Sequence, residues 1–297
     1  MNDGELIGPY RILGRLAAGG MGETYVAERV DVGKRVCLKR ILPHHATKQA
    51  YVDSFLQEAR IAARVSHQNL VTLLDCGVDA KGALFIVYEL IEGTDLSKLC
   101  ESQPHGCLRP DMVALIAHDI ANGLDCLHTD ERRHEDDDRR GPIVHRDLSC
   151  NNVVISYRGA VIVIDFGIGK MLTKDDTQST MVKGKVRYMA PETVRGQRFD
   201  TRVDQWALGV VLYRALSGSY PFDGDDQLAV LSRLVQADYP RLESPLGPLD
   251  PRWHVIVGRL LQADPDERYP TLAELVDDLE PLMPPTRVRR ELGGVVR

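Results

Sequence analysis

Two short stretches of the chain carry side chains whose types and spacing suit the transfer of a phosphoryl group. The first, HRDLSCNN (residues 145–152), places Asp147 five residues before Asn152; the second, VIVIDFG (residues 161–167), is a strand-like run that contains Asp165. Aspartate and asparagine supply the hard oxygen ligands that suit Mg²⁺. The spacing therefore predicts that Asn152 and Asp165 bind a metal and that Asp147 accepts the proton of an attacking hydroxyl.

Glycines near the N terminus could bind phosphate. The stretch LAAGGMGETY (residues 16–25) contains Gly19, Gly20 and Gly22 between two strand-like segments. Glycine lets a backbone approach a phosphate closely and adopt positive φ angles. A simple turn is the competing interpretation of this stretch taken alone. The pattern G-x-x-x-x-G-K-[ST] does not occur, so the sequence does not support a P-loop NTPase.

A lysine and a glutamate complete the predicted phosphate site. VCLK (residues 36–39) ends in Lys39 on a predicted strand, 17 residues after Gly22. Glu58 falls on a predicted helix, near the inward edge of its apolar face. Taken singly, both residues would be ordinary surface charges. Beside the glycine stretch, however, they predict an ion pair in which Glu58 fixes the position of the Lys39 side chain. The apolar face of this helix comprises Val52, Phe55, Leu56, Ala59 and Ala63.

The apolar pattern divides the chain into two parts. The first third favours short strands, at 35–42 and 83–91, with one helix between them, and helices dominate after a hinge at EGTD (92–95). A ligand cleft is expected between the two lobes. The later helices are predicted at 95–101, 111–128, 202–217, 225–236, 252–262 and 271–282.

Three further motifs point to a family. APE (190–192), DQWALG (204–209) and DPDER (264–268) follow HRDL and DFG in order. With these motifs, the chain resembles a eukaryotic-type (Hanks-type) protein kinase domain, and its sequence is most similar in character to the bacterial serine/threonine kinases. The resemblance runs from about Tyr10 to Leu282.

The resemblance implies an α+β, two-lobed protein kinase fold. A small β-rich lobe would carry one regulatory helix, a larger lobe would be helical, and ATP would bind in the cleft between them. Glu192 would pair with Arg268, and Asp204 would brace the catalytic loop from beneath. The implied divisions are an N-terminal extension (1–9), a kinase domain (10–283) with its N-lobe at about 10–92 and its C-lobe at about 93–283, and a C-terminal tail (284–297).

The resemblance also implies which residues bind ATP. Tyr88 would stand at the gatekeeper position, and Glu89 to Ile91 would form the hinge whose backbone binds adenine. The chain departs from the family at Thr24, which replaces a valine, and at Cys37, which replaces an alanine. Both are small enough for ATP to fit. The implied set is Leu16, Gly19, Gly22, Thr24, Cys37, Lys39, Tyr88, Glu89, Ile91, Val154 and Asp165.

The catalytic stretch departs from the family at Ser149, where most members have a lysine that contacts the transferred phosphoryl group. The family also has a threonine where this chain has Lys185, and in family members those two side chains touch. Two interpretations remain open. Either the two residues have exchanged places and Lys185 supplies the charge, or Lys185 points to solvent and Ser149 is a defect. Losing such a donor outright would reduce the rate by about 10²–10³.

The resemblance suggests a regulatory loop. Arg146 precedes the catalytic aspartate, and family members with this arginine are commonly switched by phosphorylation of the activation loop, here residues 168–189. A phosphate on the loop could pair with Arg146 and order it. We predict Thr180 as the site, with Thr177 and Ser179 next. Ordinary polar loop residues are the alternative.

Composition narrows the range of partners. The 297 residues carry a formal net charge of −6 and have a pI of about 5.9, which does not favour nucleic-acid or membrane-surface binding. Six cysteines without a CxxC pair indicate reduced thiols. No membrane segment or signal peptide is recognised, so we expect a cytoplasmic protein or the cytoplasmic part of a longer one. The basic run RVRR (287–290) and the charged segment 129–141 are expected to be solvated.

Together these features predict an active protein kinase. It would transfer the γ-phosphoryl group of ATP, with Mg²⁺ or alternatively Mn²⁺, to serine or threonine hydroxyls of a protein, and would phosphorylate itself in trans. Serine and threonine are favoured over tyrosine because the tyrosine-kinase pattern A-A-R does not follow HRDL. One alternative is a pseudokinase, which binds nucleotide without phosphotransfer because Ser149 replaces the lysine. The other is a small-molecule phosphotransferase, which the APE motif and the late arginine disfavour.

Overall fold

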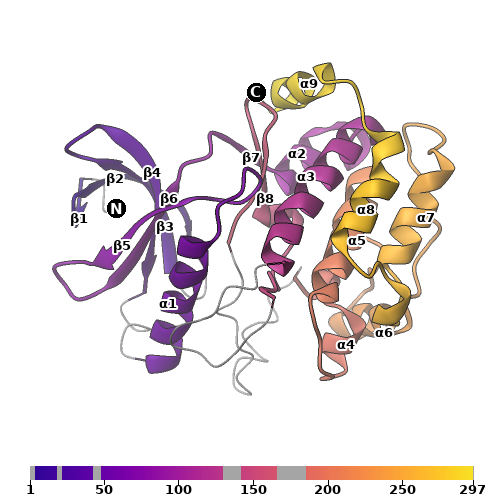
Figure 1. Ribbon diagram of the computed structural model, residues 1–297, viewed down its shortest axis with the longest axis horizontal. Helices are drawn as coiled ribbons and strands as arrows, with labels where there is room; N and C mark the ends of the chain where they lie inside the picture. The colour runs from indigo at the N-terminus through magenta and orange to yellow at the C-terminus, as the bar shows by residue number, and fades with distance from the viewer. Residues whose placement is uncertain (1–3, 19–21, 43–47, 130–141, 166–184, 297) are drawn as a thin grey trace.

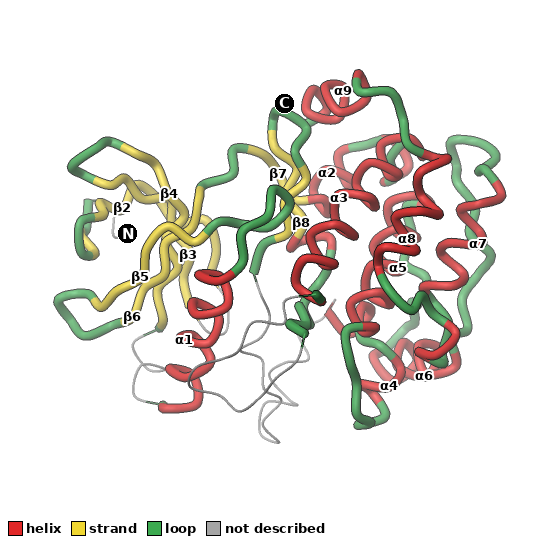
Figure 2. The backbone as a smooth tube through the Cα atoms, in the orientation of Figure 1, coloured by secondary structure: helices red, strands yellow, loops and turns green. Residues whose placement is uncertain are grey.

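The computed structural model describes residues 4–18, 22–42, 48–129, 142–165 and 185–296. A smaller lobe built on a curled sheet lies beside a larger, mainly helical lobe (Figures 1 and 2). The predicted α+β, two-lobed arrangement is confirmed.

A six-stranded antiparallel sheet forms the smaller lobe, in the order β1-β2-β3-β4-β6-β5. Neighbouring residues of a strand point to opposite faces of the sheet. Leu38 and Val87 therefore join Tyr10 in an apolar cluster on one face, whereas Lys39 and Tyr88 reach toward helix α1 on the other. The strands are β1 (Leu6–Ile7), β2 (Tyr10–Ala18), β3 (Gly22–Arg29), β4 (Lys34–Ile41), β5 (Leu73–Val78) and β6 (Leu84–Glu89).

Helix α1 (Gln49–Arg64) packs one face into the interior. Phe55 and Ala59 are buried as predicted, but the prediction is wrong at Ala63, which is exposed, and Ala62 is buried in its place. A helix turns by about 100° per residue, so position 62 falls within about 20° of Phe55 while position 63 lies about 80° away.

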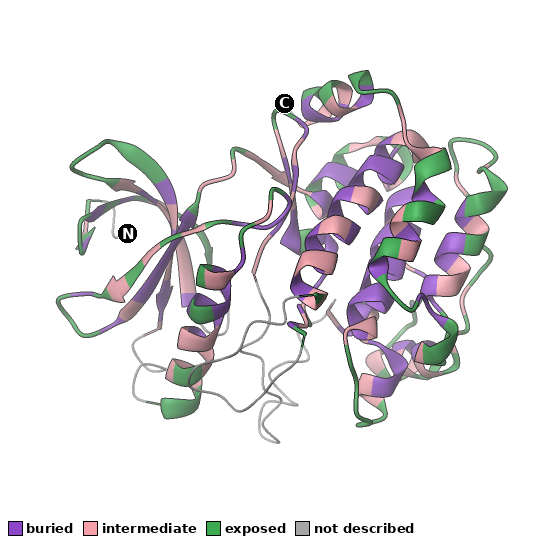
Figure 3. Ribbon diagram, viewed as in Figure 1, coloured by how far each residue is buried: buried purple, intermediate pink, exposed green. Residues whose placement is uncertain are grey.

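The larger lobe is built around two long helices, α3 (Pro110–His128) and α5 (Arg202–Ser217). Buried residues follow both helices (Figure 3). The helix predicted at 271–282 is shorter, because α8 ends at Leu279 and a 3-10 turn follows. No helix in the described part of the chain is long and apolar enough to cross a membrane. The other elements are α2 (Leu96–Ser102), α4 (Pro191–Val194), α6 (Gln227–Gln236), α7 (Pro251–Leu260), α8 (Leu272–Leu279), α9 (Arg287–Val295) and a small sheet of β7 (Gly93–Asp95), β8 (Val153–Ser156) and β9 (Val161–Val163).

The C-terminal basic run is not the solvated tail that the sequence predicted. Helix α9 includes it and packs on the larger lobe, with Val288 and Leu292 buried. Arg289 donates hydrogen bonds to both oxygens of the buried Asp119 on α3, at 2.6 and 3.0 Å. Val288 and Leu292 are four residues apart and therefore share one face of the helix. That face, with Arg289 beside it, anchors the segment.

Several predicted features lie outside the described residues. They are Gly19, the activation-loop residues Thr177, Ser179 and Thr180, and nearly all of the charged segment, from 130 to 141. The proposals made for them stay predictions.

Candidate active site

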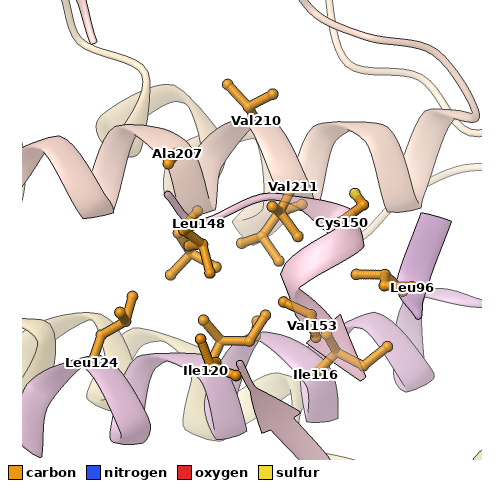
Figure 4. Packing of buried hydrophobic residues seen from close by; sticks show 14 of the residues in the cluster. Leu96, Ile116, Ile120, Leu124, Leu148, Cys150, Val153, Ala207, Val210 and Val211 are labelled. Carbon is orange, nitrogen blue, oxygen red and sulfur yellow. The ribbon is translucent and has the colours of Figure 1, made fainter. Parts of the chain in front are cut away.

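The catalytic stretch is anchored by its apolar residues. Leu148 and Cys150 are buried between α3 and α5, so the loop is fixed from both sides (Figure 4). Asp147, Leu148 and Ser149, together with Lys185, line a cavity of about 320 Å³. The burial of Leu148 and Cys150 thus anchors the stretch that carries Asp147.

Asp204 on α5 braces the loop from below, as the resemblance implied. One carboxylate oxygen accepts a hydrogen bond from the backbone N–H of His145 at 2.8 Å, and the other accepts one from the N–H of Arg146 at 2.9 Å. His128 Nε2 lies 2.9 Å from the first oxygen. Burial opposes the charge on Asp204, but these partners outweigh it and lower its pKa. The carboxylate therefore holds Arg146 in a left-handed conformation, with φ of 64°.

Asp147 is held by two side chains. The Asn152 amide donates hydrogen bonds to the carbonyl oxygen and to Oδ2 of Asp147, at 2.8 and 2.9 Å. The Lys185 ammonium donates to the same Oδ2 at 2.6 Å. Lys185 thus points at the Asp147 carboxylate. The Ser149 hydroxyl is buried and has no hydrogen-bond partner among the described residues, so it does not bond to Asp147.

A second cluster joins the lobes. Lys39 on β4 donates hydrogen bonds to both carboxylate oxygens of Glu58 on α1, at 2.7 and 3.0 Å, and to Oδ1 of Asp165 at 3.1 Å. Burial opposes the charge on Lys39, but Asp165 and Glu58 outweigh it and raise the pKa of its ammonium. Lys39 is therefore a fixed positive charge.

Asn152 and Asp165 fit a Mg²⁺ ion. The backbone N–H of Ile164 donates to the carbonyl oxygen of Asn152 at 2.9 Å, which keeps Asn152 and Asp165 in adjoining segments. Both Asn152 amide hydrogen bonds go to Asp147, so the amide oxygen is the atom with which Asn152 can bind a cation. One carboxylate and one amide oxygen fill only part of the coordination sphere of a metal ion. This suits Mg²⁺, which usually keeps phosphate and water ligands as well.

Gly22 has a structural reason to be glycine. It pairs with Ile41 across β3 and β4, and a Cβ atom at Gly22 would meet the Arg40 carbonyl oxygen at 2.5 Å. The close approach of the two strands therefore requires glycine here, whatever the residue does for phosphate.

Most of the predicted adenine residues lie on adjoining strands of the smaller lobe, whereas Ile91 follows β6 and Val154 lies on β8 of the other sheet. Cys37 on β4 pairs in register with Tyr88 on β6, one step from Glu89 at the end of that strand. Burial raises the pKa of the Cys37 thiol to about 12, so it behaves as an inert side chain. Among the others, Thr24, Ile91 and Val154 are partly buried and Leu16 is exposed.

Sequence reasoning missed one contact. The Tyr88 hydroxyl donates a hydrogen bond to Oε1 of Glu58 at 2.9 Å. Tyr88 was expected only beside adenine. No sequence signal links it to a residue 30 positions away on a different kind of element.

The late arginine is placed as the resemblance implied. Arg268 donates from its two terminal nitrogens to the two carboxylate oxygens of Glu192, at 2.8 and 2.9 Å, and both side chains are buried. The guanidinium also lies 5.1 Å from the centre of the Trp206 ring.

Comparison with known proteins agrees with this arrangement. The profile of the protein kinase domain matches residues 10–278. The chain belongs to the protein kinase family. This kinase is 36% identical over 280 residues to the tyrosine-protein kinase MasK of Myxococcus xanthus, an alignment that covers 92% of this chain and 43% of MasK. It is 30% identical over 272 residues to the serine/threonine-protein kinase PknL of Mycobacterium tuberculosis, covering 91% of this chain and 65% of PknL.

The kinase therefore spans less than two thirds of the length of these two relatives. The crystal structure of the PknI kinase domain of Mycobacterium tuberculosis has the same fold. It superimposes with a TM-score of 0.70 at 24% identity, covering 95% of this chain and 98% of the PknI chain.

Proposed function

We propose that this kinase is an active enzyme that transfers the γ-phosphoryl group of ATP to serine or threonine hydroxyls of a protein. The observation that carries the proposal is the 2.6 Å contact between the Lys185 ammonium and the Asp147 carboxylate. Because Ser149 replaces the usual lysine, an active enzyme needs another cation beside Asp147. Lys185 is that cation.

Asp147 and Lys185 would act on the reacting atoms. The substrate hydroxyl oxygen forms a bond to the γ-phosphorus while the bond from that phosphorus to the bridging β-phosphate oxygen breaks, which releases ADP. Asp147 orients the hydroxyl and accepts its proton. Lys185 stabilises the charge on the oxygens of the group in transfer.

The second cluster would bind the nucleotide phosphates. Lys39, held by Glu58, would contact the α- and β-phosphates, and Asn152 and Asp165 would hold Mg²⁺. The metal ion, when bound, neutralises phosphate charge.

The hydroxyl that accepts the phosphoryl group has two candidates. PknL and PrkC are named serine/threonine-protein kinases, whereas MasK, at 36% identity, is named a tyrosine-protein kinase. We favour serine and threonine because A-A-R does not follow HRDL. Phosphoamino-acid analysis of a labelled product separates the two. Phosphoserine or phosphothreonine is expected, and phosphotyrosine alone would contradict the preference.

Self-phosphorylation in trans gives the most direct test of activity. The purified chain is incubated with Mg²⁺ and ATP, and its intact mass is measured beside an Asp147→Asn variant. Phosphate should be added to the wild type only, and peptide mapping then tests Thr180, Thr177 and Ser179 as the sites. ATP binding with no transfer, to itself or to a panel of protein substrates, would instead support the pseudokinase alternative.

Variants of Lys185 test the observation that carries the proposal. Lys185→Ala should lower kcat by about 10²–10³. Lys98→Ala is the matched control, because Lys98 also pairs with an aspartate, Asp95, at 2.9 Å but on the surface. It should leave kcat unchanged. The double variant Ser149→Lys with Lys185→Thr restores the usual family pair and should recover much of the loss. An unchanged kcat in Lys185→Ala would remove Lys185 from the mechanism.

A further inference from the structure

The carboxylate of Glu58 is held by two residues rather than one. Its Oε1 accepts hydrogen bonds from Lys39 at 2.7 Å and from the Tyr88 hydroxyl at 2.9 Å, while Oε2 accepts one from Lys39 at 3.0 Å. Glu58 is 6% and Tyr88 5% exposed, so water does not compete freely for these bonds. A buried carboxylate needs such donors, because removing its charge from water is costly.

The sheet register delivers the Tyr88 hydroxyl to this position. Tyr88 pairs with Cys37, and Ile86, two residues earlier on β6, pairs with Lys39. Positions two apart on a strand share a face, so Tyr88 and Lys39 project from one face of the sheet toward α1. One donor comes from the end of the strand that leads into the hinge, and the other from the middle of the sheet.

These two donors constrain Glu58 differently. Lysine and glutamate are both long side chains, so an ion pair between them can persist while the helix shifts, because both can change rotamer. A tyrosine ring packed in the interior has little such freedom. The hydroxyl therefore fixes Oε1 at one point relative to β6. Burial, and then the charge of Glu58, raise the pKa of Tyr88 well above its ordinary value, which keeps the hydroxyl a donor.

We propose that Tyr88 is a positioning residue: its hydroxyl fixes the Glu58 carboxylate, and through it the Lys39 ammonium, in the arrangement that binds the nucleotide phosphates. This inference rests on the proposed kinase function. Tyr88 was expected to contact adenine, and the proposal gives it a second role. Through Tyr88, the strand before the hinge holds α1 in place.

The test removes one hydroxyl. Tyr88→Phe keeps the ring and its packing and should lower kcat/KM about ten- to a hundredfold, the loss expected for a hydrogen bond to a charged group. Tyr10→Phe is the matched control. The Tyr10 hydroxyl also donates to a carboxylate, Asp75 Oδ2 at 2.8 Å, from a buried ring in the same lobe. It lies in the apolar cluster on the opposite face of the sheet. Tyr10→Phe should keep wild-type kcat/KM.

A double-mutant cycle separates positioning from general packing. If the hydroxyl acts through Glu58, adding Tyr88→Phe to a Glu58→Gln variant should change kcat/KM by less than about twofold. A structural role for the tyrosine would give the same fold-loss in both backgrounds. Equal losses, or wild-type activity in Tyr88→Phe alone, would overturn the inference.

Amide hydrogen exchange gives a readout that does not need turnover. In Tyr88→Phe, the amides of α1 should exchange faster than in the wild type, while Tyr10→Phe should leave α1 unchanged. If the wild type transfers no phosphate but this difference appears, the proposed function has failed and the positioning contact stands. If the wild type is active and α1 exchanges identically in all three proteins, the contact does not position Glu58.

Discussion

At the scale of single residues, His145 shows how a buried ring fixes the backbone of Asp147. The ring is 0% exposed. Its Nδ1 accepts a hydrogen bond from the backbone N–H of Asp147 at 3.3 Å, and its Nε2 lies 3.3 Å from the Ile164 carbonyl oxygen. A neutral imidazole protonated at Nε2 satisfies both contacts. A second proton on Nδ1 would remove the acceptor that Asp147 uses.

This arrangement predicts a loss of stability in mild acid. Burial lowers the pKa of His145 even though Asp204 and Asp147 oppose the effect. The unfolded chain therefore binds the proton more readily than the folded one. The contribution of His145 to the free energy of unfolding is fully present above the unfolded pKa of about 6.5. It is lost as the pH falls below that value, by at most about 1.4 kcal/mol per pH unit.

Urea unfolding at pH 7.5, 6.5 and 5.5 measures the effect. The wild type should lose stability across this series, and His145→Gln should show a smaller slope. His254→Gln, which changes a partly exposed histidine on α7, serves as the control and should follow the wild type. Identical slopes in all three proteins would show that His145 does not cause the acid sensitivity.

The same scale separates what sequence can predict from what it cannot. Asp147, Asn152 and Asp165 could be proposed from the sequence because the chemistry expected of them depends on residue type and short spacing. The Tyr88–Glu58 hydrogen bond was missed because it depends on how a strand register meets a helix face, which no local pattern encodes. A packing reason for glycine at position 22 was also missed, since a Cβ atom there would meet the Arg40 carbonyl oxygen of the next strand.

At the scale of elements, the strongly patterned segments were predicted well and α9 was not. Helices α3 and α5 carry many apolar residues, and burial decided their position. The segment that forms α9 reads as a basic run, and its partner Asp119 lies 170 residues away from Arg289. Only the folded lobe brings the two together. Its docking is a tertiary property.

The docking of α9 gives an element-scale prediction. Arg289→Ala should destabilise the protein by about 1–3 kcal/mol, because it leaves the buried Asp119 carboxylate without its bidentate partner. Arg290→Ala, one residue along and exposed, should change stability by less than about 0.5 kcal/mol. Urea unfolding of both variants measures the difference. Equal stabilities would mean that α9 is held by its apolar residues alone.

At the scale of the whole molecule, a few long-range contacts tie the functional segments to the larger lobe. The resemblance to kinases predicted the two lobes and the pairing of Glu192 with Arg268. It could not predict how completely that pair is buried, which depends on the surrounding packing. Arg268 also donates to the backbone carbonyl oxygens of Gln262 and Arg202, so one side chain joins α4, the segment just after α7 and the start of α5.

Because the Glu192–Arg268 pair is buried, removing either partner should strongly lower the stability of the protein. Removing one partner leaves a charge in the interior, so Arg268→Ala and Glu192→Ala should each destabilise the protein by about 3–5 kcal/mol. Arg252→Ala breaks a comparable contact with Asp250, 3.0 Å long but exposed, and should cost less than about 1 kcal/mol. Urea unfolding measures all three.

A double variant distinguishes the charge from the packing. Replacing both partners by apolar residues, as Glu192→Leu with Arg268→Met, removes the unpaired charge and keeps most of the volume. It should be more stable than either alanine variant, because the desolvation penalty of both ions disappears with them. If it is no more stable than the single variants, the four hydrogen bonds of Arg268 and its contact with Trp206, rather than charge compensation, hold α4 to the lobe. Helix α4 directly follows the segment that carries Lys185, so the position of α4 also affects whether the Lys185 ammonium reaches Asp147. Measuring kcat on the same variants would test this link.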